Sequence, residues 1–235
     1  MKLGVALCVM TWSSLVAADA AKAKQLNTEG MKLYGKKDYP AALASFTKAI
    51  AEDPTFVLAH YNAASMASLA GDFPRVVKEL EWLTASKDAS AAKALAQGKT
   101  DRDLDRASMH PRVRELVGLP PLDKVDLGEL LTERGGLWGA DASACAGLAV
   151  NAVFKKGGKV SIQSEFACDA TDANQSETGT WVVKGGKLVV KSKLIFPDGI
   201  SGELAKCPAD EGGIWCLAID GNGFNAMHRG PGTMH

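Results

Sequence analysis

The chain has 235 residues, of which 46% are hydrophobic and 23% charged, and its 27 basic side chains balance 27 acidic ones. This length suits one large domain or two small ones of ordinary globular composition. A formal net charge of zero disfavours a nucleic-acid partner, because such binding needs a concentrated basic face. After the first twenty residues we also expect no integral membrane span, since no apolar run is long enough.

Residues 1–20, MKLGVALCVMTWSSLVAADA, have the pattern of an export signal. Lys2 precedes an apolar run from Leu3 to Met10, and small residues follow up to Ala20. This order of a basic start, an apolar core and small residues at the end is typical of a cleaved signal peptide. The sequence therefore predicts an exported protein, in the periplasm or outside the cell.

Export changes how the cysteines are interpreted. Cys8 falls within the predicted signal, and four cysteines remain in the second half of the chain: Cys145, Cys168, Cys207 and Cys216. Four thiols in an oxidising compartment allow three pairings, of which we favour the two that close short loops, 145 with 168 and 207 with 216. The chain has no C-x-x-C pair and its histidines are scattered, so we expect no metal site and no cofactor.

A 34-residue repeat marks the first half. The stretch KKDYPAALASFTKAI, residues 36–50, aligns with AGDFPRVVKELEWLT, residues 70–84. The pairs at this offset are Asp38 and Asp72, Tyr39 and Phe73, Pro40 and Pro74, Gly30 and Ala64, Ala42 and Val76, Phe46 and Leu80, and Ala49 and Leu83. A fixed period of this length is typical of helical repeat proteins.

Helical spacing of apolar residues predicts the elements of this half. We expect helices at about 23–36 and 40–52, with an equivalent pair over 57–86. Pro40 fits the first turn of the second helix, where a proline is tolerated, and Pro54 stops it. Residues 88–98 predict a third, shorter helix, and residues 103–118 predict a helix pair that caps the array.

These residues resemble the tetratricopeptide repeat (TPR) family over residues 21–118. Gly30, Leu33, Ala42, Phe46 and Ala49, together with the closing proline at 54, stand at the spacing of that motif. The resemblance implies a short α-solenoid whose first helices line a concave surface that binds extended peptides or partner helices. Projected onto this chain, that surface comprises Lys24, Asn27, Met31, Tyr34, Leu58, Tyr61, Asn62 and Ser65.

One departure from the family affects the expected partner. Relatives that clamp a C-terminal carboxylate use lysine, asparagine and arginine at fixed groove positions. Asn62 matches, but Asn27 and Met31 replace the first lysine and asparagine, and Ala92 and Ala96 replace the later basic residues. The resemblance therefore implies a mixed apolar groove with two tyrosines rather than a carboxylate clamp.

Beyond a predicted linker at 119–131, the apolar spacing changes from helical to alternating. Short strand candidates follow at 149–154, 159–166, 180–184, 187–196 and 214–219, separated by glycine-containing turns. Close spacing without intervening helices means antiparallel pairing. We expect residues 132–235 to form a small, disulfide-braced antiparallel β-barrel or β-sandwich.

Gly136-Leu137-Trp138 and Arg229 are faintly similar to lipocalin-like barrels. In that family a tryptophan of the first strand is covered by an arginine of the last strand. The resemblance implies a barrel that carries a small molecule or a lipid. The alternative is that the tryptophans simply pack a core between glycine turns.

The sequence carries no G-x-S-x-G, H-E-x-x-H or phosphate-binding loop, so no catalytic residues are nominated. We expect an exported, non-catalytic adaptor that binds a protein or peptide in its helical groove. The first alternative is a small-molecule or lipid-carrying barrel mounted on the repeats. The second is an enzyme with its site on β-domain loops, drawing on Asp169, Asp172, Asp210, Glu211 and His228. The oligomeric state stays open.

Overall fold

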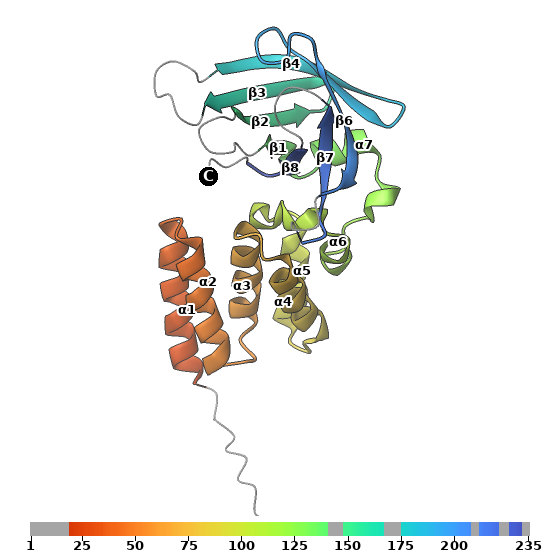
Figure 1. Cartoon of the computed structure of the whole chain (residues 1–235). Coiled ribbons are helices and arrows are strands. Elements are labelled where there is room, and N and C mark those ends of the chain that lie inside the picture. Colours follow the sequence, from red (N-terminus) through yellow and green to blue (C-terminus); the bar gives the residue numbers. More distant parts are fainter. Residues whose placement is uncertain (1–18, 141–147, 167–174, 208–211, 221–225, 232–235) are drawn as a thin grey trace, which may run out of the picture.

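The computed structural model describes residues 19–140, 148–166, 175–207, 212–220 and 226–231, without the side chains of 148, 149, 165 and 166. A helical half precedes a closed antiparallel β-barrel, as expected from the sequence (Figure 1). The predicted signal peptide lies outside the described residues except for its last two positions. Within the described ranges, none of the helices has the length and apolarity needed to cross a membrane.

Two antiparallel helical hairpins begin the chain. The first consists of α1 (Ala20–Gly35) and α2 (Tyr39–Glu52), and the second of α3 (Val57–Leu69) and α4 (Phe73–Ala85). The shorter α5 (Ala89–Gly98) packs against α3 and α4. Figure 1 shows the five helices side by side beneath the barrel.

The 34-residue offset recurs in the hydrogen bonds of both hairpins. Asp38 accepts from the backbone N–H of Ala41, and Asp72 accepts in the same way from Arg75. Each aspartate thereby caps a helix that has proline in its first turn, which satisfies a donor that the helix itself leaves unpaired. The residue before each aspartate has a positive φ, 61° at Lys37 and 76° at Gly71. The two hairpins are therefore equivalent units at the level of backbone geometry.

The capping segment differs from the expected helix pair. It forms the 3-10 turns η1 (Arg102–Leu104) and η2 (Ala107–Met109), followed by the six-residue α6 (Pro111–Leu116). Proline lacks the backbone N–H that a helix interior requires, and it disfavours a helical conformation of the residue before it. A new helix, α6, therefore begins at Pro111, and His110 is its N-cap.

Residues 119–131, expected to be a linker, are folded onto the barrel. They contain η3 (Leu122–Lys124) and most of α7 (Leu127–Thr132), and η4 (Glu133–Gly135) follows. Leu130 and Leu131 are fully buried because α7 packs against β1, β2, β4 and β5. The connection between the halves is thus part of the core.

The barrel is an up-and-down meander in which every strand pairs with its neighbours along the chain. Its strands are β1 (Leu137–Ala140), β2 (Leu148–Lys155), β3 (Lys159–Phe166), β4 (Gln175–Lys184), β5 (Lys187–Lys191), β6 (Ile200–Lys206), β7 (Trp215–Asp220) and β8 (Ala226–Arg229). Closure comes from β1 and β8, where Trp138 lies opposite Arg229 and Gly139 opposite His228. Full closure leaves no edge strand exposed.

One end of the barrel is closed by α7 and by a tryptophan–arginine pair. The Trp138 indole donates to the carbonyl of Leu131 at 3.2 Å, and the Arg229 guanidinium lies 4.9 Å from the centre of its ring. Arg229 also donates to the carbonyls of Glu133 and Leu130. This is the arrangement that the faint lipocalin-like resemblance implied for these two residues.

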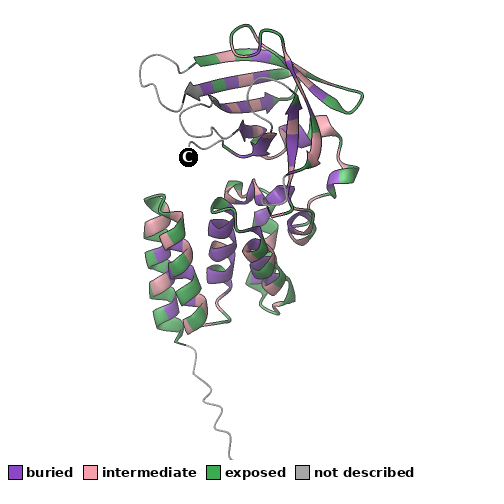
Figure 2. Cartoon of the chain, viewed as in Figure 1, coloured by how far each residue is buried: buried purple, intermediate pink, exposed green. Residues whose placement is uncertain are grey.

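Figure 2 shows buried residues inside the barrel and along α3, with exposed positions on the outer faces. One apolar cluster runs without a break from α3 and α4 through α6 and α7 into the barrel interior. A second, smaller cluster lies between α2 and α3 and contains Ala42, Phe46, Ala63 and Met66. The first hairpin therefore packs against α3 through a cluster separate from the one that the rest of the chain shares.

Buried charges also join the halves. Arg114, which is fully buried on α6, pairs with Glu133 at 3.2 Å, and Arg229 of β8 reaches the same carboxylate at 3.4 Å. Burial lowers the pKa of Arg229 to about 10, although Glu133 opposes that shift. Charges this deeply buried are tolerated only when they are paired and hydrogen-bonded. Glu133 therefore holds two cations from opposite sides of the domain junction.

Candidate functional site: a groove between the first helices of the two hairpins

Most residues nominated from the sequence meet in one groove. Six of the eight line it, together with five further residues, around a volume of about 270 Å³. The lining residues are Met31, Tyr34, Phe46, Leu58, Tyr61, Asn62, Ser65, Met66, Gln97, Asp101 and Asp103. The walls come from α1 and α3, Phe46 belongs to α2, and η1 closes one end. A volume of this size suits one or two side chains rather than a typical small-molecule ligand.

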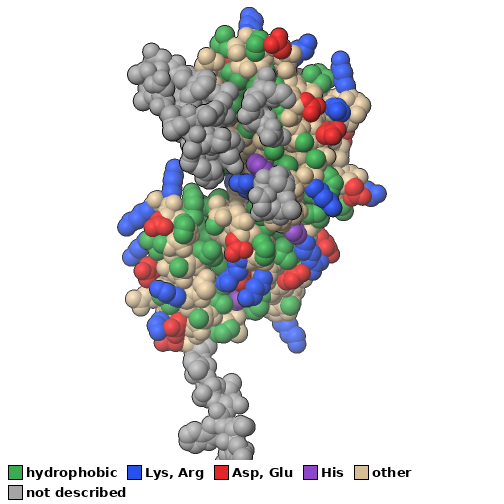
Figure 3. Space-filling model, viewed as in Figure 1, with side chains coloured by type: hydrophobic (Ala, Val, Ile, Leu, Met, Phe, Trp, Pro, Cys, Tyr) green, Lys and Arg blue, Asp and Glu red, His purple; other side chains and the backbone are tan. Residues whose placement is uncertain are grey.

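Two large apolar side chains stand open to solvent on opposite walls of this groove. Met31 of α1 is 45% exposed and Leu58 of α3 is 50% exposed. In the space-filling view, hydrophobic side chains gather over this part of the helical half among scattered charges (Figure 3). Exposed apolar side chains that line one groove are typical of surfaces that bind another protein.

The two tyrosines of the groove differ in exposure. Tyr34 is half-buried and is hydrogen-bonded to Asp103, and burial together with this carboxylate raises its pKa to about 12. Tyr61 is only 4% exposed, and its hydroxyl donates to Asp101 at 2.6 Å. Burial raises its pKa as well, and Asp101 adds to the effect. Tyr61 therefore forms part of the groove floor, and the expected projecting anchor is available only at Tyr34.

The remaining nominated residues support or flank the groove. Asn27 is buried and accepts a hydrogen bond from Asn62 at 2.9 Å, which ties α1 to α3 across the junction of the hairpins. Lys24 is exposed on α1 and does not line the groove. Ser65 is buried in the wall.

The acidic end of the groove is a feature that the sequence reasoning missed. Asp101 and Asp103 lie on the turn that precedes and forms η1, and burial raises the pKa of Asp103. The sequence signal was the run Asp101-x-Asp103-x-Asp105, of which Asp103 and Asp105 were assigned to the capping helix pair rather than to the groove.

A single arginine fixes this acidic turn. Arg134 lies at the entrance to β1 and donates to the Asp105 carboxylate at 2.7 Å and to the carbonyl of Gly98 at 3.0 Å. It also donates to the carbonyls of Lys99 and Asp101. Arg134 has a left-handed backbone conformation with φ of 55°, which a non-glycine residue adopts at a cost unless its surroundings enforce it. The barrel entrance therefore sets the geometry of the groove end.

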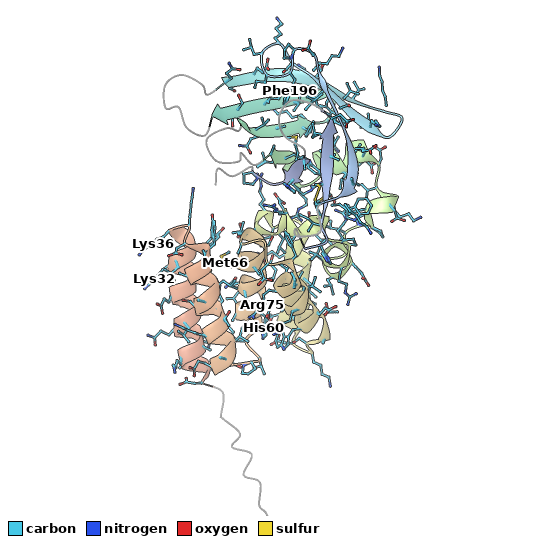
Figure 4. All side chains as sticks on the ribbon, viewed as in Figure 1. Lys32, Lys36, His60, Met66, Arg75 and Phe196 are labelled. Carbon is cyan, nitrogen blue, oxygen red and sulfur yellow. A yellow bond between two sulfur atoms is a disulfide. The ribbon has the colours of Figure 1, made fainter. Side chains whose placement is uncertain are left out.

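The barrel has a second distinctive feature, in the loop between β5 and β6. The Glu177 carboxylate of β4 accepts from three consecutive backbone N–H groups, those of Lys193, Leu194 and Ile195. The next residue, Phe196, is almost fully buried and belongs to the apolar cluster of the barrel; Figure 4 labels it near β4. One carboxylate thus holds a loop whose phenylalanine packs into the apolar core.

A larger groove, of about 910 Å³, lies where α6 and the segment after it meet Trp215 of β7. Its lining is mainly proline and leucine, and Arg112 at its rim is paired with Glu81 and Glu115. The lining also includes Asp123, which lies 3.7 Å from Lys124, so the groove combines apolar contact with exposed, paired charges.

The structure pairs Cys207 with Cys216 in a disulfide, the second of the two pairs expected from the sequence. Cys145 and Cys168 lie outside the described residues, as do Asp169, Asp172, Asp210 and Glu211, on which the enzyme alternative drew. His228 is buried on β8, facing away from the barrel interior.

Comparison with known proteins gives no match: no protein-family model, no curated protein and no solved structure is similar to this chain. The site must therefore be interpreted from its own geometry.

Proposed function

We propose that this chain is an exported, non-catalytic adaptor whose TPR-like groove between α1 and α3 binds a segment of a partner protein. The observation that carries the proposal is the groove itself: six residues chosen from the repeat pattern line one side-chain-sized hollow with an acidic end. A receptor of this size is suited to anchor side chains of a peptide or helix.

Charge and exposure define the partner. The open side chains of Met31 and Leu58 offer apolar contact, and Asp103 adds a partly exposed carboxylate beside Tyr34. The complementary ligand is a peptide or helix that carries a large apolar residue next to a lysine or arginine. Its apolar residue would lie between the two walls, with its cation toward Asp103.

Peptide selection on the full chain tests this proposal. A random peptide library is selected against the wild-type protein, and each enriched peptide is measured by fluorescence anisotropy. We expect enriched peptides to place a basic residue beside a large apolar one. Leu58→Asp should weaken their binding at least tenfold, and Asp103→Asn should reduce both the affinity and its dependence on salt.

Leu69→Asp is the matched control, because Leu69 lies on the same helix, is 37% exposed and does not line the groove. It should leave binding unchanged. Enriched peptides without a shared basic–apolar pattern, or peptides weakened equally by the Leu58 and Leu69 changes, would reject the groove assignment.

A second candidate function follows from the barrel. Its closed, apolar interior is covered at one end by α7, and the buried Phe196, on a loop that one carboxylate holds, belongs to the same apolar cluster. A loop of this kind can be displaced by an apolar small molecule or lipid. Native mass spectrometry of the full chain should then show a bound small molecule, and Phe196→Ala should increase its occupancy. Equal, empty spectra for both proteins would count against a carrier.

A further inference from the structure

The last three strands of the barrel, β6, β7 and β8, bring two sulfur atoms and an imidazole together on its outer face. Cys207 directly follows β6, Cys216 lies in β7 and His228 in β8. Leu217 pairs with Met227, and the same register places Cys216 opposite His228. The Sγ atom of Cys207 is 3.8 Å from Nδ1 of His228, and all three potential ligand atoms lie within 4.8 Å of one another.

The cluster is buried although it faces away from the barrel interior. Cys207, Cys216 and His228 are 7%, 2% and 8% exposed. Gly212 and Gly213, which precede β7, lie against the helical half, since a Cβ on Gly212 would come within 2.9 Å of Phe73 and one on Gly213 within 3.9 Å of His110. The three side chains are therefore shielded from bulk water.

The donor set fits a thiophilic divalent cation when the sulfur atoms are reduced. For tetrahedral Zn²⁺, bonds of about 2.3 Å to sulfur and about 2.1 Å to nitrogen place those two donors about 3.6 Å apart. The observed 3.8 Å between Cys207 and His228 matches this separation. Two thiolates also neutralise the two charges of zinc, which a buried site requires because an unbalanced charge there is costly.

We propose that Cys207, Cys216 and His228 form a redox-gated zinc site. A dithiol reductant transfers two electrons and two protons to the disulfide, yielding two thiols and the oxidised reductant. Zn²⁺ then binds the two sulfur atoms and the neutral imidazole, and two protons are released. In the oxidised protein the sulfur atoms are bonded to each other, so the site is closed. Three protein ligands leave a fourth position, as in sites that exchange their ligand.

The primary test compares the wild-type chain in its two redox states. The protein is reduced with a phosphine, freed of reductant under anaerobic conditions and titrated with Zn²⁺ alone against a chromophoric chelator. We expect one zinc ion per reduced chain and none per oxidised chain at this site. Co²⁺ should give the intense visible bands of tetrahedral, thiolate-bound cobalt in the reduced protein only. A folded reduced chain that takes up no zinc overturns the proposal.

Variants assign the ligands. Cys216→Ser should abolish the stoichiometric zinc, and His228→Gln should weaken it at least about tenfold. The double change Cys145→Ser with Cys168→Ser should preserve it, and so should His110→Gln, which alters the neighbouring histidine outside the cluster. Loss of zinc in the Cys145/Cys168 variant, or equal zinc binding by Cys216→Ser, would overturn the assignment. Tryptophan fluorescence of each variant verifies that it is folded.

Discussion

The contact between Gly30 and Phe46 gives the sharpest test of how the repeat unit is built. A Cβ placed on Gly30 of α1 would lie 2.5 Å from Cε1 of the Phe46 ring and 2.8 Å from two further ring carbons. Phe46 is fully buried in α2 and also lines the groove. Alanine at position 30 must therefore push the ring out of its place or force the two helices apart.

The magnitude follows from two opposing effects. Overpacking a close helix contact costs about 1–3 kcal/mol of unfolding free energy, whereas alanine in place of glycine inside a helix gains about 1 kcal/mol. We expect Gly30→Ala to destabilise the protein by up to about 2 kcal/mol, the cost that remains after this gain. Gly35→Ala is the matched control, because it lies on the same helix with nothing within 4 Å of its Cβ position. It should be neutral or stabilising by about 0.5 kcal/mol.

Urea unfolding followed by far-ultraviolet circular dichroism measures these changes. Phe46→Leu makes room for the added methyl group, so the double variant Gly30→Ala with Phe46→Leu should lose at least about 1 kcal/mol less than the sum of the single changes. A Gly30→Ala protein as stable as the Gly35→Ala control, or single effects that simply add, would refute the close-packing argument.

Three further outcomes are expected. Glu133→Gln should lower the unfolding free energy by about 3 kcal/mol in urea titrations, because it leaves two buried arginines without their carboxylate, whereas Glu115→Gln on the surface should stay within about 0.5 kcal/mol of wild type. Tyr61→Phe should cost about 1–2 kcal/mol by the same measurement, since Asp101 loses the hydroxyl that it accepts from. For Glu177, burial alone would raise the pKa, but hydrogen bonds from Ser192 and three backbone N–H groups lower it overall from 4.5. Because the pKa of Glu177 is lower in the folded state than in the unfolded state, the ionised carboxylate stabilises the protein above about pH 4.5, and this stability is lost as the pH falls further. Amide exchange over residues 193–195 should therefore accelerate in acid. Glu177→Gln should remove that pH dependence. An acid response unchanged by this substitution would contradict the anchoring role.

The helical half could be predicted because its signals are local. Asp38 and Asp72 cap helices within three residues of themselves, and the prolines that follow fix where those helices begin. The 34-residue offset then aligned the small and large positions of the two hairpins. Nothing comparable marks the capping segment, where Pro111 divides what looks like one helical pattern.

The barrel was predictable as a class but not strand by strand. β1 and β8 have four residues each and were not among the strand candidates read from alternation, since their pairing comes from closure of the barrel. Only the lipocalin-like resemblance placed Trp138 and Arg229 on a first and a last strand. β6 was missed because Gly202 interrupts its alternation of apolar and polar residues. The glycine leaves room for a close contact, since a Cβ at this position would lie 2.6 Å from the Ile219 side chain. Residues 192–196 read as a continuation of β5, but the Glu177 carboxylate turns them into a loop.

The groove was located from the repeat pattern, whereas its acidic end and the burial of Tyr61 were not. The hydroxyl of Tyr61 meets Asp101 across 40 positions of sequence, and His228 meets Cys207 across 21. Contacts over such separations leave no periodic signal, so residue types alone could not show that a buried cysteine pair has a histidine beside it.

Arg134 changes where the helical unit should be considered to end. Its guanidinium is the last component of the turn at residues 98–105, yet it stands beyond the proline-rich stretch where the composition shifts. A fragment cut at 118 would leave the carbonyls of Gly98, Lys99 and Asp101 without their donor and Asp105 without its closest cation, with only Arg102 beside it at 3.7 Å. A fragment cut after Gly135 is longer but retains that cation, so the groove could keep its shape in it.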